Sequence, residues 1–588
     1  MYKGQCSLFQ EENMKAKKKL IGILLVIVVV VLSLGVLTAC GETPGETSKN
    51  KKAVVICTAL LSGGLYDTKT NEAIWDPVAE GVYFQQVFPG GDMMGLVMAV
   101  LTDKTTYDLI GGIMKYKDES VENLLWQITL DEQGKSNNPN LRPANVRPTT
   151  ADGTFKSTLY NDSGEVVDGY GAYTAGEKIQ YGAIAAYRQQ CLDLKARYEK
   201  QGWDVVVFNY DWRIDNRVNS ELLEQFIQTN GWEEVILTSH SMGGPVVAGY
   251  IARLQNKWLE AEAKKEGQTD VKKPNQIIRS YRAFSPATAG SLDAIYYMDD
   301  PVGAVADVVN GAVGDTLGGV VLGVDAISEG VKKLAGPLMQ NLTSVMQLLP
   351  FQTFADSDYY GENESPVYVD GVPVTNMYEW YCSRPWAHTS DWKPGVDGIY
   401  DKLKPGMKNL PEYWDSFYVK EEPSDNVRVY APELVNTTYC LGVGYNTTKS
   451  VQIVTKDTDT VKVNKVTYEM WDTRNHKYDT PLTSIEYYSY DHKALLYGNG
   501  DGTMPTNACL GGLNYKDGKT TTNEKTKMPI YDENEKTYVL QEYIIKQVRK
   551  QITNICFYNA DHGTVGGYWD VLKWDFYDMI DAIIAQGA

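Results

Sequence analysis

The stretch Val235-Ile-Leu-Thr-Ser-His-Ser-Met-Gly-Gly-Pro245 decides the fold. Its apolar start predicts a short buried strand, followed by a sharp turn with Ser241 at its tip and a helix from about Met242. Ser239 and Gly243 stand two residues before and two after Ser241, so the G-x-S-x-G pattern is met with Ser in the first place. Such a turn lifts one hydroxyl above the edge of a sheet. The alternative is a turn whose serine only caps the helix.

More strands are predicted on both sides of this turn. Strand-like runs lie at residues 53–57, 203–208, 277–284, 427–430, 438–443 and 552–558, and helical patterns at 179–201 and 220–229. Strands that alternate with helices predict a mostly parallel central sheet with helices on both faces. Together with the serine turn, this order predicts an α/β-hydrolase fold that carries a large cap or lid insertion.

The first forty residues predict export from the cytoplasm. Four lysines between positions 15 and 19 precede the uncharged run 20–39, which is also long enough to span a bilayer. Leu37-Thr-Ala-Cys40 resembles the lipobox of bacterial lipoproteins, in which the cysteine is lipidated and becomes the mature N-terminus. We therefore predict a lipid anchor on Cys40 at the extracytoplasmic face of a bacterial cell membrane. An uncleaved membrane helix is the alternative, and Met14 is an alternative start.

Composition narrows the classes of partner. The chain of 588 residues has 43% hydrophobic residues, which excludes a disordered chain, and a formal net charge of −19. Residues 1–39 carry a charge of +3, so the mature chain carries −22. A body this acidic is a poor nucleic-acid binder, and no nucleic-acid partner is expected. It would also not stay on anionic lipid by charge, so a lipid anchor would be useful to it.

The chain is expected to divide into five segments. These are a signal peptide (1–39), a flexible tether (40–52), the first part of the core (53–290), a cap or lid insertion (291–425) and the second part of the core (426–588). Inside the insertion, residues 301–339 are rich in Gly, Val and Ala. Their pattern predicts buried helices of a cap, and a mobile apolar lid over the active site is the alternative.

Neither a metal nor a cofactor is expected. None of the eight cysteines forms a C-x-x-C pair, so no zinc or thioredoxin site is indicated. Gly498-Asn-Gly-Asp-Gly-Thr-Met504 resembles a calcium loop only superficially, because the Asp/Asn spacing fails and the twelfth position holds no Glu. One or two disulfides would be compatible with an extracytoplasmic chain, but the sequence does not define their pairing.

A serine nucleophile needs a base and an acid that orients the base. In this fold they follow the serine in the order acid, then histidine. Of the five histidines, at 240, 388, 476, 492 and 562, only His562 follows the late strand 552–558. His240 adjoins the nucleophile and is expected to point elsewhere. Asp501, on a tight glycine loop, is the predicted acid, with Asp561 as the alternative.

An ordered set of motifs resembles the lecithin:cholesterol acyltransferase family. The resemblance covers about residues 53–580 and implies a serine acyl hydrolase or acyltransferase acting on lipid esters, phospholipids among them. It also implies Ser241, Asp501 and His562 as the triad. The motifs are Tyr210-Asp-Trp-Arg213, Ser239-His-Ser-Met-Gly-Gly244, Ser285-Pro-Ala-Thr-Ala-Gly-Ser291, Cys440-Leu-Gly-Val-Gly-Tyr-Asn-Thr447, Gly500-Asp-Gly-Thr503 and His562.

An oxyanion hole needs two backbone N–H donors. Met242, directly after the nucleophile, is the first, and Leu61, in the loop after the first core strand, is the predicted second, with Leu60 as the alternative. The chain departs from the family where Thr58-Ala59 replaces the usual Pro-Gly. It departs again in the long interval between the acid and the histidine, which predicts an inserted hairpin. The segment 301–339 is also extra to the family pattern.

Two further residues have open roles. Arg213 is predicted to pair with a carboxylate beneath the site, and contact with substrate is the alternative. Trp75 stands where family members carry an aromatic residue in the lid. Insertion into a membrane interface and ordinary packing are equally favoured as the role of its side chain. The sequence thus predicts a membrane-tethered phospholipase or lipid acyltransferase. The alternatives are a generic surface esterase or triacylglycerol lipase, and a catalytically inactive binding lipoprotein.

Overall fold

The computed structural model describes residues 50–67, 69, 72–75, 123, 125–143, 146–147, 156–160, 166–168, 172–173, 191, 194–264, 271–302, 329–356, 360, 364–442, 445–453, 468–472, 477–482, 492–509, 531–532, 537–538, 552–558, 562–567, 580–581 and 583–585. The predicted signal peptide, Cys40, Asp561 and most of the segment 301–339 lie outside these ranges. Within them, no helix combines the length and the apolar character needed to cross a membrane.

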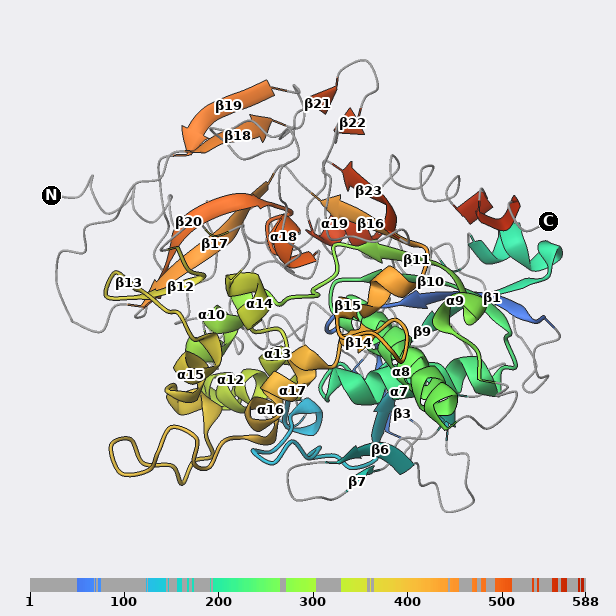
Figure 1. Ribbon diagram of the computed structural model, residues 1–588. Coiled ribbons are helices and arrows are strands. Elements are labelled where there is room, and N and C mark those ends of the chain that lie inside the picture. The colour runs from blue at the N-terminus through green and yellow to red at the C-terminus, as the bar shows by residue number, and fades with distance from the viewer. Residues whose placement is uncertain are drawn as a thin grey trace, which may run out of the picture. The chain divides into compact units, whose positions relative to one another are not determined.

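A parallel sheet forms the centre of the fold (Figure 1). Within the described residues it has six strands in the order β23-β16-β11-β10-β1-β9, and every neighbouring pair is parallel. Helices lie around the sheet, so the predicted α/β class is confirmed. The strands are β1 (Lys52–Cys57), β9 (Trp203–Phe208), β10 (Glu234–His240), β11 (Ile278–Phe284), β16 (Thr437–Gly442) and β23 (Ile552–Tyr558).

The register of the sheet brings the ends of distant strands together. Cys57 at the end of β1 stands beside Ser239 of β10 and Phe208 of β9. His240 at the end of β10 pairs in register with Phe284 at the end of β11. Because parallel strands all end at the same edge, the loops that follow them meet there. The serine turn therefore lies on an edge that also receives the loops after β1, β11 and β23.

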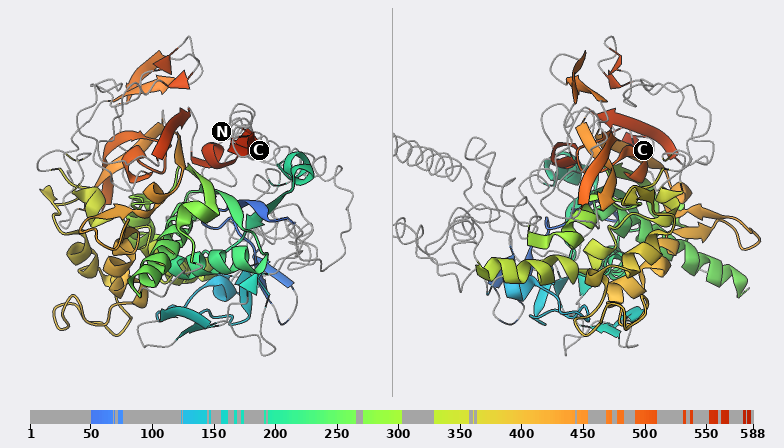
Figure 2. Two further views of the ribbon diagram at one scale, coloured as in Figure 1. Left: turned by 45° about the vertical axis from the view of Figure 1, so that its right-hand side comes forward. Right: turned by 90° about the vertical axis from the view of Figure 1, so that its left-hand side faces the viewer.

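Two long helices, α7 (Asn216–Thr229) and α8 (Gly243–Ala263), pack side by side (Figures 1 and 2). Asp215 caps α7 by accepting a hydrogen bond from the Arg217 amide. The two helices approach closely because Gly249 has no side chain, and a Cβ there would lie 2.3 Å from the Ser220 Oγ. That hydroxyl lies 2.8 Å from the carbonyl oxygens of both Asn216 and Val246, and it can donate to either. Both helices confirm the predicted ones, although α7 begins four residues earlier.

An apolar cluster forms on one face of the sheet. Successive residues of a strand point to opposite faces, so Val54 and Ile56 of β1 share a side. They belong to one buried cluster with Val205 of β9, Leu194 and Ile583. Full burial of an aliphatic side chain of this size stabilises a fold by roughly 1.5–3 kcal/mol. The predicted helical pattern before β9 therefore supplies core residues, as residue 194 shows.

The loop that holds Asp501 belongs to a second sheet, which is separate from the central one. It has the order β13-β12-β17-β20, and Asp501 follows β20 directly. A short antiparallel pair, β21 with β22, lies between Asp501 and His562 and confirms the predicted inserted hairpin. The strands of the second sheet are β12 (Val367–Val369), β13 (Val372–Pro373), β17 (Tyr445–Ile453) and β20 (His492–Gly500). Two separate pairs are β18 (Tyr468–Asp472) with β19 (Lys477–Leu482), and β21 (Tyr531–Asp532) with β22 (Thr537–Tyr538).

One predicted core strand is wrong. The run 427–430 forms β15 (Arg428–Tyr430), which pairs antiparallel with β14 (Tyr418–Lys420) and not with the central sheet. Its residues do not form the continuous buried run of a central parallel strand, because Arg428 is exposed and forms an ion pair with Asp415. Pairing with one neighbouring strand, β14, is enough for a strand as short as β15.

The predicted cap contains a series of mostly short helices where it is described. Its helices are α10 (Asp293–Asp299), α12 (Glu329–Gln340), α13 (Thr343–Met346), α14 (Gln352–Ala355), α15 (Met377–Cys382), η3 (Pro385–Ala387), α16 (Pro405–Lys408) and α17 (Leu410–Asp415). The backbone divides into two compact units, and the larger one comprises residues 44–78, 126–300 and 336–588. The smaller comprises residues 1–43, 79–125 and 301–335.

Short elements complete the described structure. They are β2 (Leu65–Asp67), β3 (Glu72–Trp75), β4 (Leu141–Pro143), β5 (Val146–Arg147), β6 (Lys156–Tyr160), β7 (Val166–Asp168), β8 (Ala172–Tyr173), η1 (Glu199–Gln201), α9 (Pro274–Ile277), η4 (Ala431–Leu434), α18 (Thr506–Cys509) and α19 (His562–Gly567). Cys57, Cys191, Cys382 and Cys509 are buried free thiols.

Candidate active site

Ser241 occupies a strained turn between β10 and α8. Its φ is 52°, a left-handed conformation that residues other than glycine rarely adopt. The turn is fixed by its backbone, because the Ser241 N–H donates to the Phe284 carbonyl at 3.1 Å and its own carbonyl accepts from the Ala287 amide at 2.9 Å. The residue at the cap position of α8 is Met242. Met242 makes no side-chain cap hydrogen bond, and Ser241 stays the predicted nucleophile, with the helix-cap role as the alternative.

The residues around the turn must be small because backbone passes close by. A Cβ on Gly243 would lie 2.7 Å from the Thr58 carbonyl oxygen, and one on Gly244 would lie 2.3 Å from the Pro286 Cβ. Ser239 takes the place of the first glycine of the pattern. Its side chain is buried and shares a 2.7 Å hydrogen bond with the Tyr281 hydroxyl, so the extra oxygen has a partner.

Asp501 presents an ionised carboxylate at the end of β20. Its side chain is 1% exposed, and Oδ1 accepts hydrogen bonds from the amides of Met504 at 2.7 Å and Thr503 at 3.1 Å. Burial alone would raise the pKa of Asp501, but the neighbouring His562 and the hydrogen bonds from His562, the Met504 amide and Ser285 lower it on balance. The Asp501 side chain is therefore an ionised carboxylate, which accepts hydrogen bonds and donates none.

His562 is hydrogen-bonded to this carboxylate. Its Nδ1 lies 2.7 Å from the Asp501 Oδ2, and its backbone N–H donates to the Asp501 carbonyl at 2.9 Å. Since an ionised carboxylate only accepts, the hydrogen bond assigns the proton to Nδ1. The other ring nitrogen, Nε2, is then the one that can accept a proton, as a general base must.

His240 does not point away from the site as expected. Its ring centroid lies 4.7 Å from that of His562, and its Nε2 lies 2.8 Å from the His562 carbonyl oxygen. Burial, and then the proximity of His562, lower the pKa of His240 to about 3, so its ring stays neutral. The contact joins the residue directly before Ser241 to the residue that pairs with Asp501. His240 therefore connects the serine turn to the Asp501–His562 pair.

His388 serves the packing of the predicted cap. It is buried, its ring nitrogens lie 2.8 Å from the carbonyl oxygens of Cys382 and Asp401, and it stacks on Trp392 with ring centroids 3.9 Å apart. Both nitrogens are thus occupied by backbone partners. His476 lies outside the described residues.

The predicted oxyanion donors lie on loops at the carboxyl edge. Leu61 has a φ of 61°, again left-handed. Among the described residues, the amides of Leu60, Leu61 and Met242 have no hydrogen-bond acceptor. Unengaged N–H groups are what an oxyanion hole requires. Leu61 stays the prediction, and Leu60 stays the alternative, since both amides share this property.

Three aromatic side chains hold the loop that carries Leu61. The Tyr210 hydroxyl donates to the Thr58 carbonyl at 2.7 Å, and the Trp212 indole donates to the Gly63 carbonyl at 2.9 Å. The Trp75 indole donates to the Leu61 carbonyl at 2.9 Å and packs edge-to-face on Trp212, with ring centroids 5.7 Å apart. Trp75 thus packs on the loop.

Arg213 is structural in the way that its motif predicts. Its guanidinium and the Asp211 carboxylate are both 0% exposed, and two of its nitrogens bind the two carboxylate oxygens at 2.8 and 2.7 Å. A third nitrogen donates to the Ser136 Oγ at 2.9 Å. The partner carboxylate is therefore inside the Tyr-Asp-Trp-Arg motif itself.

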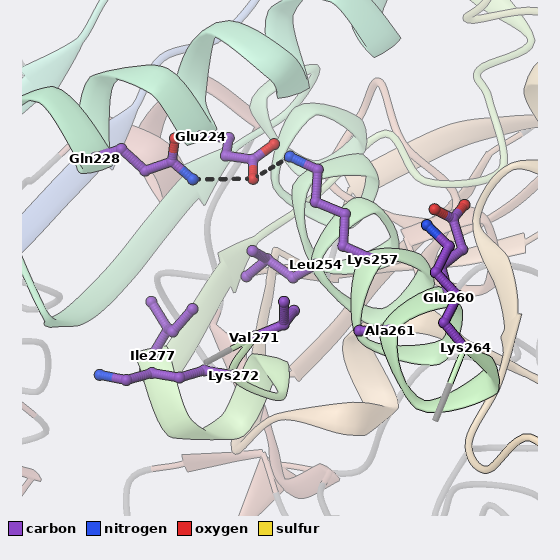
Figure 3. Close-up of a pocket in the computed structure, with 10 residues that line it drawn as sticks. All are labelled: Glu224, Gln228, Leu254, Lys257, Glu260, Ala261, Lys264, Val271, Lys272 and Ile277. Carbon is purple, nitrogen blue, oxygen red and sulfur yellow. Dashed lines mark hydrogen bonds and ion pairs between the residues drawn. The ribbon is translucent and has the colours of Figure 1, made fainter. Parts of the chain in front are cut away.

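A surface hollow of about 590 Å³ lies beside the second half of α8 (Figure 3). It is lined by residues of α7, by the second half of α8 from Leu254 to Lys264, and by Val271, Lys272 and Ile277 before β11. Glu224 and Lys257 form an ion pair of 2.6 Å on its wall. Since a helix rises about 1.5 Å per residue, Leu254 lies roughly 20 Å along α8 from Ser241. The hollow therefore does not serve the serine.

Comparison with known proteins finds likeness among solved structures only. No protein-family model matches the chain, and no curated protein matches it either. The chain is similar to a chain in "The crystal structure of Tle4-Tli4 complex", with a TM-score of 0.35 and 13% sequence identity over 79% of this chain and 90% of that one. A likeness of that size says nothing about the reaction. The strand–turn–helix around Ser241, on a parallel sheet enclosed by helices, is itself the predicted α/β-hydrolase fold.

Proposed function

We propose that this protein is a serine-dependent acyl hydrolase or O-acyltransferase that acts on lipid esters, with Ser241, Asp501 and His562 as its triad. The observation that carries the proposal is the 2.7 Å hydrogen bond between Asp501 and His562, in the cluster that His240 links to the serine turn. An acid, a base and a strained serine in one cluster are the parts that acyl transfer needs.

The reaction begins when the Ser241 Oγ attacks the ester carbonyl carbon while His562 Nε2 takes the hydroxyl proton. The negative charge on the former carbonyl oxygen is bound by the amides of Met242 and Leu61. The intermediate collapses as His562 returns the proton to the departing alcohol, which leaves an acyl group on Ser241. Water or a second alcohol then attacks the acyl-enzyme by the same route in reverse. Asp501 stabilises the imidazolium in both halves.

The proposed substrate class rests on the resemblance of the ordered motifs to the lecithin:cholesterol acyltransferase family. A phospholipid is the favoured acyl donor. The alternatives are a generic surface esterase or triacylglycerol lipase, and a binding lipoprotein without activity. Because either water or an alcohol can accept the acyl group in the second half-reaction, hydrolysis and transfer are two outcomes of one mechanism.

Substrate turnover separates these alternatives. Purified protein is incubated with phospholipid vesicles that carry a labelled acyl chain, with and without a sterol or long-chain alcohol. Labelled fatty acid alone would indicate a hydrolase, and labelled ester of the acceptor an acyltransferase. Turnover of short soluble esters without phospholipid would favour the esterase, and no turnover would favour the binding lipoprotein. Ser241→Ala is the control for contaminating activity.

The membrane tether is the second part of the proposal. Lipidation of Cys40 would hold the acidic body beside its lipid substrate at the extracytoplasmic face. Cys40→Ser should move the protein from the membrane to the soluble fraction, whereas Cys6→Ser, inside the predicted signal peptide, should leave it with the membrane. Retention of the Cys40→Ser protein would favour the uncleaved helix.

A further inference from the structure

His562 is hydrogen-bonded to both Asp501 and His240. Its Nδ1 and its N–H are both hydrogen-bonded to Asp501, at 2.7 and 2.9 Å. Its carbonyl oxygen lies 2.8 Å from the Nε2 of His240. The Asp501 contacts come from a loop after a strand of the second sheet. The His240 contact joins the base to the strand of the central sheet that leads into Ser241.

His240 is a rigid support for such a contact. It is the last residue of β10, its backbone pairs in register with Phe284 of β11, and its side chain is 6% exposed. It is also the chain neighbour of Ser241. A group held by the sheet on one side and by the nucleophile's own turn on the other can fix the distance between base and nucleophile.

We propose that His240 is a positioning residue for the triad, and that its hydrogen bond to the His562 carbonyl fixes the imidazole of His562 relative to Ser241. The inference deepens the proposed function and rests on it. A carbonyl oxygen only accepts, so His240 Nε2 must carry the proton and donate it. The neutral ring of His240 also adds no positive charge next to the imidazolium that forms on His562.

Two substitutions separate the effect of the His240 hydrogen-bond donor from the effect of its aromatic ring. His240→Phe keeps an aromatic ring against His562 and removes the donor. His240→Gln places an amide N–H at about the reach of the lost Nε2 and so restores the donor. His388→Phe is the control, because it removes hydrogen bonds of the same 2.8 Å length, here to the carbonyls of Cys382 and Asp401 in the predicted cap.

Ester hydrolysis is measured per active site, with sites counted by exhaustive fluorophosphonate labelling. Since a displacement of about 1 Å in a catalytic group can cost about 100-fold, His240→Phe should lower kcat by about 10- to 100-fold and leave KM within about twofold. His240→Gln should recover most of the loss, and His388→Phe should keep kcat. An unchanged kcat in His240→Phe, or equal losses in His240→Phe and His240→Gln, would overturn the proposal.

A spectroscopic readout makes the test independent of the substrate. The proton shared by His562 Nδ1 and the Asp501 carboxylate should give a far-downfield NMR signal when His562 is protonated. That signal should broaden or vanish in His240→Phe and persist in His240→Gln and His388→Phe. If wild-type protein hydrolyses no ester but follows this pattern, the proposed function fails and the positioning role stands. A sharp signal in His240→Phe would contradict the positioning role.

Discussion

Ser241 holds a backbone conformation that costs free energy in any residue other than glycine. A left-handed residue of this kind costs about 1–2 kcal/mol. The hydrogen bonds to Phe284 and Ala287 hold it there, and the lack of side chains at Gly243 and Gly244 leaves room for the turn. The result of this local strain is a partly buried serine at the end of a buried strand.

Asp501 should be required for catalysis in its ionised form. Asp501→Asn keeps the size of the side chain but presents an amide N–H or a weaker acceptor to His562, which favours the wrong tautomer of the imidazole. We expect kcat for ester hydrolysis to fall by about 10⁴-fold, in proportion to the effect of the same change in other triads. A loss below about tenfold would exclude Asp501 as the acid.

The stability contributed by Asp501 should depend on pH. Because the folded state lowers the pKa of Asp501, ionisation of this group stabilises the fold above the ordinary carboxyl pKa of about 4. That contribution is lost as the pH falls through the lower folded value. The gap in urea midpoint between wild type and Asp501→Asn should therefore shrink below about pH 4. A gap that stays constant down to about pH 2 would contradict this linkage.

At the scale of elements, the loop after β1 depends on side chains from the segment after β9. Tyr210 and Trp212 bind the carbonyls of Thr58 and Gly63, at the two ends of the stretch that contains Leu61. The Tyr-Asp-Trp-Arg motif is therefore a support for the predicted oxyanion loop. This explains how a motif without any catalytic group can belong to the site.

Loss of one of these supports should lower the rate without weakening substrate binding. Tyr210→Phe removes the hydrogen bond to the Thr58 carbonyl, which costs about 1 kcal/mol of stability. If the loop then shifts, the Leu61 N–H no longer points at the oxyanion. We expect kcat to fall by about tenfold with KM unchanged. Tyr381→Phe is the matched control, since it removes a 2.9 Å hydrogen bond to the Pro350 carbonyl. Equal kcat in both variants would argue against a role for the loop.

At the scale of the whole molecule, the parallel sheet brings residues together that are far apart in the chain. His240 and His562 are 322 positions apart, yet their rings are in contact because β10 and β23 end at the same edge. The second sheet delivers Asp501 to this edge from a separate strand. The site therefore requires both sheets to be folded.

The buried pair of Arg213 and Asp211 should be important for stability. Arg213→Met leaves the Asp211 carboxylate buried without its cation, which costs about 3–5 kcal/mol. Arg428→Met breaks an ion pair whose side chains are 46% and 59% exposed, and such pairs contribute less than about 1 kcal/mol. Denaturant unfolding should show a large loss only for the first variant. Similar midpoints would mean that Asp211 finds another partner.

The sequence predicted those features of the fold and site that depend on short-range patterns of residues. Alternation of apolar runs and helical periods located the strands of the central sheet, and chain order selected His562 and Asp501, which the structure places in hydrogen-bond contact. It failed for residues 427–430, because a three-residue strand has no pattern that reveals its partner. It also failed for His240, since the contact with His562 depends on how two strands end in space.

The most direct test of the proposed triad is covalent labelling of the purified protein by a fluorophosphonate probe, followed by peptide mapping. The probe traps a serine that a neighbouring base activates. We expect one modified residue, Ser241, with labelling abolished in Ser241→Ala and strongly slowed in His562→Ala. Undiminished labelling of Ser241→Ala, or modification of another serine in the wild-type protein, would contradict the assignment of Ser241 as the nucleophile.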